Sequence, residues 1–405
     1  MAARVRTLRG MERSPRPRRL PRPPAPRVLG RREFLVLVGG AAAASALQPA
    51  SAWARRQRRP VVTLQPWALP VDRPAPGIEL VRALIGAAVL APSDWNSQPW
   101  RFEAGPDAIR VLADPQRALP RTDPDRRGMY VALGAALENM VLAARAWGLQ
   151  PTVLYLPDAA RGAVADVVWG DAGARRDRDL FGALIERRTN RRNYDGRRLL
   201  SHVRAQLTAQ VADGPRLHWL DDHDGLRDLG RLVHDAVHAQ VSDRLTQAEQ
   251  HLWLRTSRED AARRGDGVPV EALGLSGPAN WFSGSYYDPG SWFLRFGAGS
   301  LAKRAREGLR TAGAAVLLTV PGRDESAWLA GGQAYERLVL KATQLGLAHQ
   351  PMNAPVEVER FRERLLRRFG VTGGEPLMLV RLGRGPRVPH TPRRAVAAVA
   401  GFRGA

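Results

Sequence analysis

Residues 134–149 read GAALENMVLAARAWGL, and residues 332–347 read GQAYERLVLKATQLGL. The two stretches align without a gap, with identical residues at eight of the sixteen positions. Both carry apolar residues at the spacing of one helix face, and both end in Gly-Leu, which is typical of a helix that stops at a left-handed glycine. Helices rich in Ala and Leu often look alike, but matching ends favour a duplication. The offset of 198 residues is too long for a solenoid repeat, so we predict two copies of one domain.

Helical and strand patterns are mixed around this repeat, without a regular βαβ alternation. Outside the repeat, the helical patterns lie in 78–90, 179–186, 226–263 and 356–369. The strand patterns lie in 101–103, 108–113, 152–156, 216–220, 314–320 and 377–382. We therefore predict an α+β fold of mixed or antiparallel sheets flanked by helices. Its two similar halves would cover 75–175 and 176–405.

Residues 1–54 are expected to be a targeting signal and not part of the fold. The segment 1–29 is rich in Arg and Pro, and Gly30-Arg31-Arg32-Glu33-Phe34-Leu35 precedes a mildly apolar stretch and two small-residue sites. This order is typical of a signal peptide, and the adjacent arginines resemble the twin-arginine export signal. We expect the export machinery to carry the folded protein to the periplasm or cell envelope. An Arg-rich disordered tail on a cytoplasmic protein is the alternative.

The composition excludes several classes of protein. The formal net charge is +23, but residues 1–60 hold 15 Arg and 2 Glu, so +13 of it lies in that segment. Arginine makes up 60 of the 62 basic residues, and no nucleic-acid-binding motif is present, so we expect no nucleic-acid partner. The absence of cysteine excludes disulfides, thiol catalysis and thiolate metal sites. No apolar run reaches the ~18 residues of a membrane span.

Two polar segments contain candidate ligand-binding residues. Residues 91–100 read APSDWNSQPW and place Ser, Asn and Gln on a loop, where they suit a planar ligand with many hydrogen bonds. Residues 187–194 read RRTNRRNY, and their four guanidinium groups suit a phosphate monoester.

At these residues the chain resembles the nitroreductase-like flavoproteins. The shared patterns are Ser-x-x-Asn-x-Gln-Pro-Trp, Arg-Arg-Ser/Thr-x-Arg-x-Tyr/Phe, and the Gly-x-Ala-x-Glu helix that ends in Gly-Leu. In that family, FMN lies at a dimer interface, where the arginine arm comes from one subunit and the Ser/Asn/Gln loop from the other. Here the arm follows the loop, in the reverse of the usual order. Fusion explains this reversal, because each half carries the element that the other lacks. The chain is thus similar to the Acg-type branch, single-chain pseudo-dimers that hold one FMN, and we expect it to be a monomer.

The resemblance implies a set of cofactor-binding residues. The phosphate and ribityl chain would be bound by Arg187, Arg188, Thr189 and Arg191. The other half would contact the flavin or ribityl through Ser93, Asn96 and Gln98. In the C-terminal basic segment, Arg393 and Arg394 would also reach the phosphate, and Arg394 is favoured. The segment Ala348, His349 and Gln350 would lie against the ring and offer a backbone N–H to flavin N5. No catalytic side chain is expected, because the flavin carries the chemistry.

Two further features of the sequence allow more than one interpretation. Residues 280–296 hold seven aromatic side chains among Gly, Ser and Pro, in an insert near 265–300. This insert is either a lid, over the flavin or over the vacant second site, or an ordinary packed loop, and a membrane-interface role is a third interpretation. His234 and His238 have the spacing of a metal pair, but no third ligand completes a site, so we expect no metal.

The resemblance implies an FMN-dependent oxidoreductase that passes hydride or electrons from flavin N5 to a small acceptor such as a nitroaromatic or quinone. NAD(P)H is the candidate electron donor. The alternative is a protein that sequesters FMN with little turnover.

Overall fold

The computed structural model describes residues 67–211, 214–255, 257–274 and 294–402. The predicted signal region lies outside these residues, and so does most of the aromatic insert. Among the described helices, none has both the length and the apolar character needed to cross a membrane.

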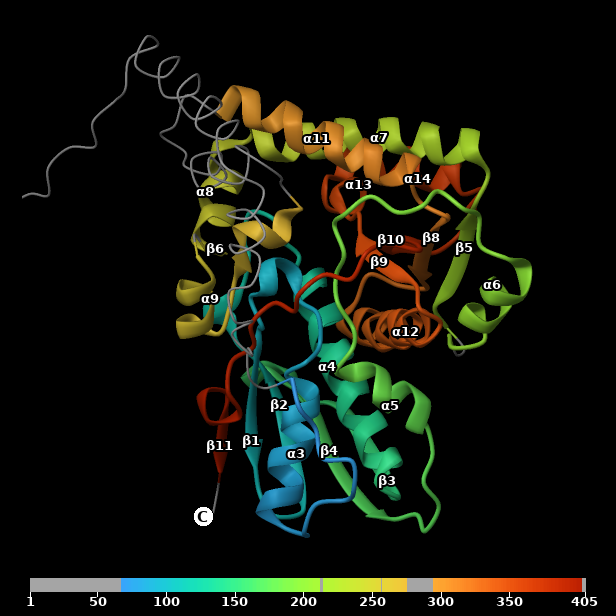
Figure 1. Ribbon diagram of the computed structural model, residues 1–405. Coiled ribbons are helices and arrows are strands. Elements are labelled where there is room, and N and C mark those ends of the chain that lie inside the picture. The colour runs from blue at the N-terminus through green and yellow to red at the C-terminus, as the bar shows by residue number, and fades with distance from the viewer. Residues whose placement is uncertain (1–66, 212–213, 256, 275–293, 403–405) are drawn as a thin grey trace, which may run out of the picture. The chain divides into compact units, whose positions relative to one another are not determined.

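The first half is a five-stranded sheet with helices on one face (Figure 1). Its strand order is β11-β1-β2-β4-β3, antiparallel except where β11 joins β1. Burial alternates along β1: Trp100, Phe102 and Ala104 face the core, while Arg101 is exposed. The elements of this half are α3 (Ile78–Ala88), η1 (Asp94–Asn96), β1 (Trp100–Ala104), β2 (Ala108–Ala113), η2 (Pro115–Arg117), α4 (Arg127–Ala146), β3 (Leu149–Asp158), η3 (Ala159–Arg161) and β4 (Ala163–Asp171), and α5 (Arg178–Leu184) follows as the first helix of the second half.

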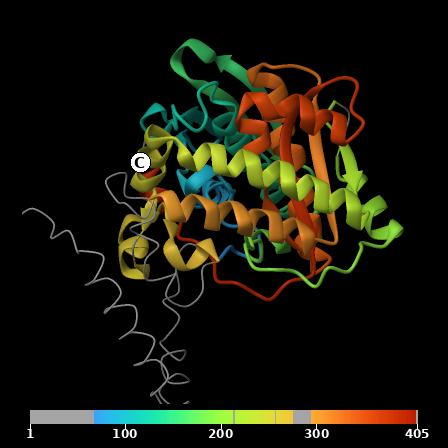
Figure 2. The same ribbon diagram turned by 90° about the horizontal axis from the view of Figure 1, so that it is seen from above.

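The second half is a four-stranded antiparallel sheet, in the order β5-β8-β10-β9, between two helical layers. Every residue of β8 is buried, because Val316 and Leu318 face one core and Ala315 and Leu317 face the other. Helix α12 covers the first of these faces, and α7 and α11, which run side by side, cover the second (Figure 2).

The elements of the second half are α6 (Ser201–Thr208), β5 (Arg216–Leu220), α7 (His223–Ser242), α8 (Arg244–Leu252), β6 (Leu254–Arg255), α9 (Arg258–Arg264), β7 (Val268–Pro269), η4 (Val270–Leu273), α11 (Leu294–Arg310), β8 (Ala314–Val320), α12 (Glu325–Gln344), β9 (Ala348–Pro351), α13 (Ala354–Glu357), η5 (Glu359–Phe361), α14 (Arg362–Arg368), β10 (Glu375–Gly383), η6 (Val396–Ala398) and β11 (Ala400–Phe402).

The two repeat helices, α4 and α12, pack against each other where the halves meet, and they cross at two glycines. A Cβ on Gly134 would collide with the carbonyl oxygen of Leu329, and a Cβ on Gly332 would collide with that of Val131. These glycines occupy the same position of the sequence repeat, and each is opposed by the residue three positions before the other. The contact is therefore reciprocal, as in an interface with two-fold symmetry.

The C-terminal segment ties the two halves together. It leaves the second sheet at the end of β10, passes the first half, and ends as β11 beside β1, with Phe102 opposite Ala400. Figure 1 shows this segment in red, running from the upper sheet to the lower one.

The sequence predictions agree with the structure for the strand pair β1–β2, for β5, β8 and β10, and for both repeat helices. The helices end as expected at left-handed glycines, Gly148 and Gly346, with φ of 77° and 69°. The helical runs predicted within 226–263 are confirmed as the helices α7, α8 and α9, with Asp243 ending α7 and capping α8, and only the two-residue strand β6 interrupts them. The expectation of an irregular segment before β8 is wrong from residue 294 onward, where α11 begins, and strands β4, β9 and β11 were not predicted.

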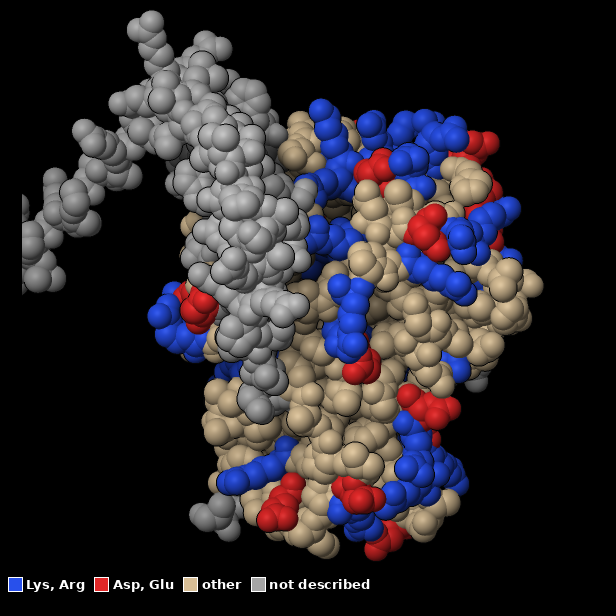
Figure 3. Space-filling view, viewed as in Figure 1, with Lys and Arg blue, Asp and Glu red and all other residues tan. Residues whose placement is uncertain are grey.

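Charge on the described surface is mixed. Figure 3 shows acidic side chains interspersed among the basic ones over the upper helices and at the lower edge.

Candidate functional site

Two cavities meet at the junction between the halves. We call the smaller one, of about 80 Å³, the arginine cavity, and the larger one, of about 280 Å³, the wide cavity. Both are lined by Pro92 and Ser93 from the first half and by Thr189 and Arg191 from the second. The shared lining makes them adjoining parts of one site, built from both halves.

The arginine cavity has a strongly basic lining. Its basic residues come from the arm after α5 and from the C-terminal segment: Arg187, Arg188, Arg191, Arg192 and Arg393. Glu271 is the acidic residue among the described lining. Five guanidinium groups against one carboxylate, around so small a space, suit a multiply charged anion.

Backbone contacts hold the arm in place. Thr189 pairs with His349 of β9 as an isolated bridge, and the Asn190 N–H donates to the His349 carbonyl at 2.9 Å. Beyond the cavity, the Arg381 guanidinium lies 4.0 Å from the centre of the Tyr194 ring and donates to the Arg192 carbonyl at 2.8 Å. The arm is therefore fixed at both ends by the second sheet.

Hydrogen bonds join the arm to the loop of the other half. The Leu90 carbonyl accepts from Arg187 Nη2 at 2.9 Å and from Arg393 Nη2 at 3.2 Å. Arg393 Nη1 donates to Asn96 Oδ1 at 2.9 Å. Arg187 and Asn96 are thus connected through Arg393 and Leu90, although they lie in different halves of the sequence.

Burial lowers the pKa values of several basic groups at this cavity. Desolvation, with Arg187 nearby, lowers the pKa of Arg393 well below its usual value, and desolvation with Arg387 nearby lowers that of Arg188. His390 has its pKa lowered to about 3 by burial and by Arg188, so its imidazole is neutral. The Nε atoms of Arg187, Arg188 and Arg393 are buried without a hydrogen-bond partner. Such groups are costly to bury alone, and a bound anion would satisfy them.

One buried carboxylate lies behind this cavity. Glu336 of α12 is fully buried, and its Oε1 lies 3.5 Å from Arg187 Nε. With its amide oriented to satisfy both neighbours, Asn139 of α4 donates to Glu336 at 3.0 Å and accepts from the Ala91 N–H at 3.2 Å. Burial raises the pKa of Glu336 to about 7, against the opposing effect of Arg187.

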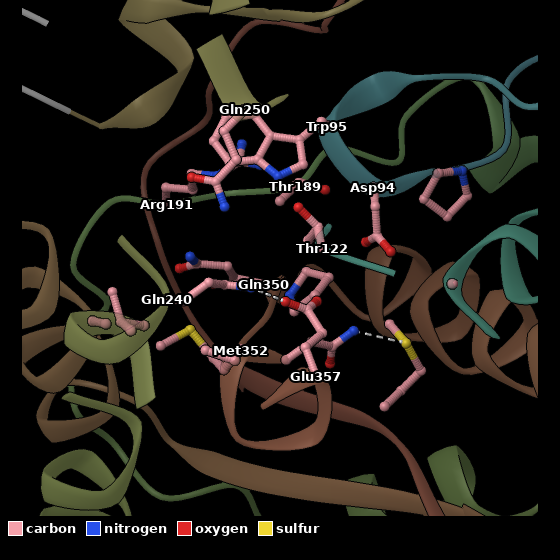
Figure 4. A pocket seen from close by; sticks show the side chains of 18 of the residues that line it. Asp94, Trp95, Thr122, Thr189, Arg191, Gln240, Gln250, Gln350, Met352 and Glu357 are labelled. Carbon is pink, nitrogen blue, oxygen red and sulfur yellow. Dashed lines mark hydrogen bonds between the residues drawn. The ribbon is translucent and has the colours of Figure 1, made fainter. Parts of the chain in front are cut away.

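The wide cavity has apolar walls and polar ends. Its apolar side chains come from α4, α7 and the segment around β9 and β10, and include Val131, Val233, Val237, Met352 and Met378. Figure 4 shows Asp94 and Thr122 on one side and Glu357 on the other, with Gln240, Gln250 and Gln350 also at the wall. The space suits a flat apolar molecule with a few polar atoms.

Two acidic side chains, Asp94 and Glu357, line this cavity, and the charge of Asp123 acts on both. Burial and Asp123 raise the pKa of Asp94 to about 6, and burial and Asp94 raise that of Glu357 to about 8. Asp123 does not line the cavity; its carboxylate accepts from the N–H groups of Gly128 and Met129 at 2.9 Å and so caps α4.

Comparison with known proteins gives the family. No family model matches the chain. A Mycobacterium tuberculosis protein named "Putative NAD(P)H nitroreductase Rv3131" is 31% identical over 333 residues, which are 80% of this chain and 92% of that protein. The chain belongs to the nitroreductase family. It is thus an oxidoreductase by family.

Other relatives are more distant. "Putative NAD(P)H nitroreductase acg" of the same organism is 25% identical over 78% of this chain and 94% of its own length. The FMN-dependent nitroreductase NfnB of Mycobacterium smegmatis, solved in complex with NADPH, matches with a TM-score of 0.31 and 15% identity, over 52% of this chain and 94% of its own.

The structure of this nitroreductase brings most of the predicted residues together. The arginine cavity is lined by Ser93, Asn96, Arg187, Arg188, Thr189, Arg191 and Arg393, and the wide cavity by Gln350 and again by Ser93, Thr189 and Arg191. His349 is buried behind this lining, where burial lowers its pKa to about 3, and it contributes its backbone carbonyl to the arm.

Besides His349, three predicted residues lie outside the lining: Gln98, Ala348 and Arg394. The Gln98 amide is fully buried, donates to the Gly265 carbonyl at 2.7 Å and accepts from the Arg394 N–H at 2.9 Å. Arg394, which the sequence favoured over Arg393, turns away and donates to the Ala398 carbonyl at 2.8 Å. Asn96 also has a structural role, since its Nδ2 donates to the carbonyls of Gly267 and Pro392.

Several lining residues were missed by the sequence reasoning, namely Trp67, Asp94, Thr122, Gln240, Gln250, Tyr335 and Glu357. Glu336, behind the arginine cavity, was also missed as a site residue. One signal could have found it: Glu336 is an identical position of the repeat, aligned with Glu138.

Proposed function

We propose that the two cavities of this nitroreductase hold one FMN, with the phosphate in the arginine cavity and the ring system in the wide cavity. When bound and reduced, the flavin supplies a hydride to a small acceptor such as a nitroaromatic or a quinone. The relatives' names include NAD(P)H, and we propose the same donor here.

One observation carries this proposal: the buried arginine atoms without a partner. The buried Nε atoms of Arg188 and Arg393 lack a hydrogen-bond partner, and burial disfavours the charge of both groups. A phosphate monoester carries two negative charges near neutral pH and three strong acceptor oxygens. It would relieve the repulsion among the guanidiniums and satisfy their free N–H groups together. A neutral ligand would not relieve that repulsion.

The wide cavity supports the assignment of the ring. Its apolar side chains suit the faces of an aromatic system, and its amides and backbone groups suit polar ring edges. Gln350 and Pro351 line it from β9, the segment expected to meet the ring. Pro92 and Ser93, shared by both cavities, would lie beside the chain that links phosphate to ring.

Identification of the cofactor tests the proposal. We expect the purified protein to be yellow, to release one FMN per chain on denaturation, and to be bleached by NADH, NADPH or dithionite. Rapid recovery of the colour on adding a quinone or nitroaromatic supports the enzyme. A folded preparation that stays colourless and refuses added FMN overturns the proposal. A flavin that only dithionite reduces, and that no acceptor reoxidises, overturns the proposed turnover.

Two neighbouring arginines provide a matched pair of variants. Arg393 lines the arginine cavity, whereas Arg394 does not. Arg393→Met should raise the FMN dissociation constant about 10- to 100-fold, because a hydrogen bond to a charged group contributes about 1.5–3 kcal/mol. Arg394→Met should leave it nearly unchanged. Equal effects would contradict the placement of the phosphate.

A further inference from the structure

Asp94 and Glu357 both line the wide cavity, and neither lines the arginine cavity. We propose that Glu357, with Asp94 as the residue that tunes it, is the proton donor to the acceptor reduced in the wide cavity. This inference rests on the function proposed above and adds a catalytic side chain where the sequence indicated none.

The chemistry of the reaction requires such a donor. Reduction of a quinone to a hydroquinone takes two electrons and two hydrogens. A hydride from the reduced flavin provides both electrons and one hydrogen, so the second hydrogen must arrive as a proton on an oxygen of the acceptor. In the proposed step, the O–H bond of the Glu357 carboxylic acid breaks as the acceptor's O–H bond forms. The carboxylate then takes a proton from water, which restores the resting state.

The position of Glu357 suits this step. It is the last residue of α13 and lines the wide cavity but not the arginine cavity. Gln240 of α7 donates from Nε2 to Glu357 Oε2, and the Glu357 side chain is half-buried, so it is not sealed off from the cavity that it lines. Figure 4 shows Glu357 directed into the space that Asp94, Thr122 and Gln350 also face. An acceptor in this space would lie within reach of the acid.

The surroundings keep a proton available near neutral pH. Glu357 experiences the negative charges of Asp94 and Asp123, and these act in the same direction as burial. The Gln240 hydrogen bond and the cation Arg127 oppose them. Arg127 is turned partly away, since its Nη2 donates to the Val356 carbonyl at 3.1 Å, which also accepts from Arg362 Nε at 2.6 Å. With a pKa of about 8, most of the Glu357 carboxyl is protonated at neutral pH.

The same geometry defines the class of acceptor. The walls beside the acid pair are apolar side chains of Val131, Val233, Val237 and Met352. With Glu357 protonated, the charge of Asp94 and the apolar walls make this end of the cavity unfavourable for an anion. The cavity therefore fits a neutral aromatic acceptor that carries its oxygen toward Glu357, a quinone before an anionic analogue.

The test compares two glutamates that are two residues apart. Glu357→Gln keeps the size of the side chain and removes the proton. Glu359→Gln is the control, because Glu359 is exposed at the start of η5. Each FMN-loaded protein is reduced with dithionite, mixed anaerobically with menadione as a neutral quinone, and followed by recovery of flavin absorbance between pH 6 and 10.

We expect the wild-type rate to be level below about pH 8 and to fall about tenfold per pH unit above it, because the donor must be protonated. Glu357→Gln should lower the rate about 10²- to 10⁴-fold and abolish its fall above pH 8. Asp94→Asn should shift the start of this fall to lower pH, since it removes a negative charge that raises the pKa of Glu357. Glu359→Gln should behave as wild type.

A second readout does not depend on turnover. Infrared difference spectra of the oxidised protein should show a protonated carboxyl band at pH 7 that disappears above pH 9. The band should be missing in Glu357→Gln and retained in Glu359→Gln. FMN content and affinity should be unchanged in both variants, which separates this role from cofactor binding.

The two proposals fail in different ways. A wild-type protein that binds no FMN, or that menadione does not reoxidise, refutes the proposed function. A wild-type protein that turns over, while Glu357→Gln matches its rate, pH profile and carboxyl band, refutes the proton donor alone.

Discussion

The two repeat helices present equivalent glutamates to opposite sides of their crossing, and the two sides differ. On one side, Glu336 of α12 faces Arg187, which reaches it from the arm at 3.5 Å and lines the arginine cavity. On the other side, Glu138 of α4 is bound by Arg337 of α12 at 2.8 Å and by Gln333 at 3.0 Å. Arg337 also lies 3.5 Å from Asp177.

This difference shows what makes a site out of a symmetrical scaffold. The crossing provides a buried glutamate on both sides, and an arginine lies beside each of them. On the Glu138 side the arginine comes from the partner helix itself, at the repeat position that Asn139 occupies in α4. On the Glu336 side the helix offers Asn139 instead, and the cation comes from a loop that brings further arginines with it. We infer that the cofactor lies only on the Glu336 side for this reason.

The largest expected effect comes from breaking the crossing that both sides share. Gly332→Ala would place a methyl group against the Val131 backbone, which cannot move aside as a flexible side chain could. We expect a loss of about 3 kcal/mol or more in the free energy of unfolding, together with loss of bound FMN. Denaturant unfolding followed by circular dichroism measures it.

Gly182→Ala is the control for that substitution. Gly182 lies in helix α5 with nothing near its missing side chain. The change should stabilise the protein by up to about 1 kcal/mol. A Gly332→Ala protein as stable as wild type would contradict the close packing of α4 on α12.

Arg187 and Arg337 can be compared directly by substitution. Arg187→Met and Arg337→Met each remove the cation from a buried glutamate, so both should lower the free energy of unfolding. Only Arg187→Met should also raise the FMN dissociation constant, about 10- to 100-fold. Flavin fluorescence quenching measures the affinity. An equal loss of FMN binding in both variants would mean that the Glu138 side also holds cofactor.

A smaller effect concerns pH. In the folded protein the pKa of Glu336 is about 7, above its usual value near 4.5, so folding favours its protonated form. Its contribution to stability is therefore fully present below about pH 4.5 and is lost as the pH rises to about 7. The apo protein should lose part of this pH dependence in Glu336→Gln, by at most about 1.4 kcal/mol per pH unit. Parallel stability curves for variant and wild type between pH 4.5 and 7 would contradict it.

The smallest effect should come from the outer wall of the arginine cavity. Trp67 stacks on His390 with ring centres 4.0 Å apart, and the Arg393 guanidinium lies 4.8 Å from its centre. Trp67→Ala should speed FMN dissociation about 2- to 10-fold, as expected from about 0.5–1.5 kcal/mol of stacking. Stopped-flow release measures the rate. Trp169→Ala on β4 should not change it, and an equal change there would contradict a local effect.

Local patterns were enough to predict much of the fold. The continuous apolar run of β8 and the helix endings at Gly148 and Gly346 are properties of neighbouring residues. Strand β4 was missed because Asp166 interrupts its apolar pattern, and only the structure shows that Arg110 of the adjacent strand pairs with it at 2.7 Å. The short strands β9 and β11 depend on partners that are distant in sequence.

In the candidate site, too, local patterns could be predicted and contacts between distant residues could not. The arginine arm could be read from one run of residues, whereas Asp94 and Glu357 are brought together only by the packing of α13 near the loop after α3. The choice between Arg393 and Arg394 depended on the path of the C-terminal segment, because adjacent residues of an extended chain point in opposite directions. Gln98 was predicted to bind a ligand because its amide can donate and accept hydrogen bonds. In the fold, this amide is used to bind the backbone of Gly265 and Arg394.

The path of the C-terminal segment also has a consequence for biosynthesis. A ribosome makes residues 384–402 after both sheets' other strands, yet Arg393 forms a wall of the arginine cavity and β11 completes the first sheet. During translation, a nascent chain could therefore fold its helical crossing while the anion pocket still lacked that wall. Stable capture of a phosphorylated ligand would then have to wait until residues 384–402 have left the exit tunnel.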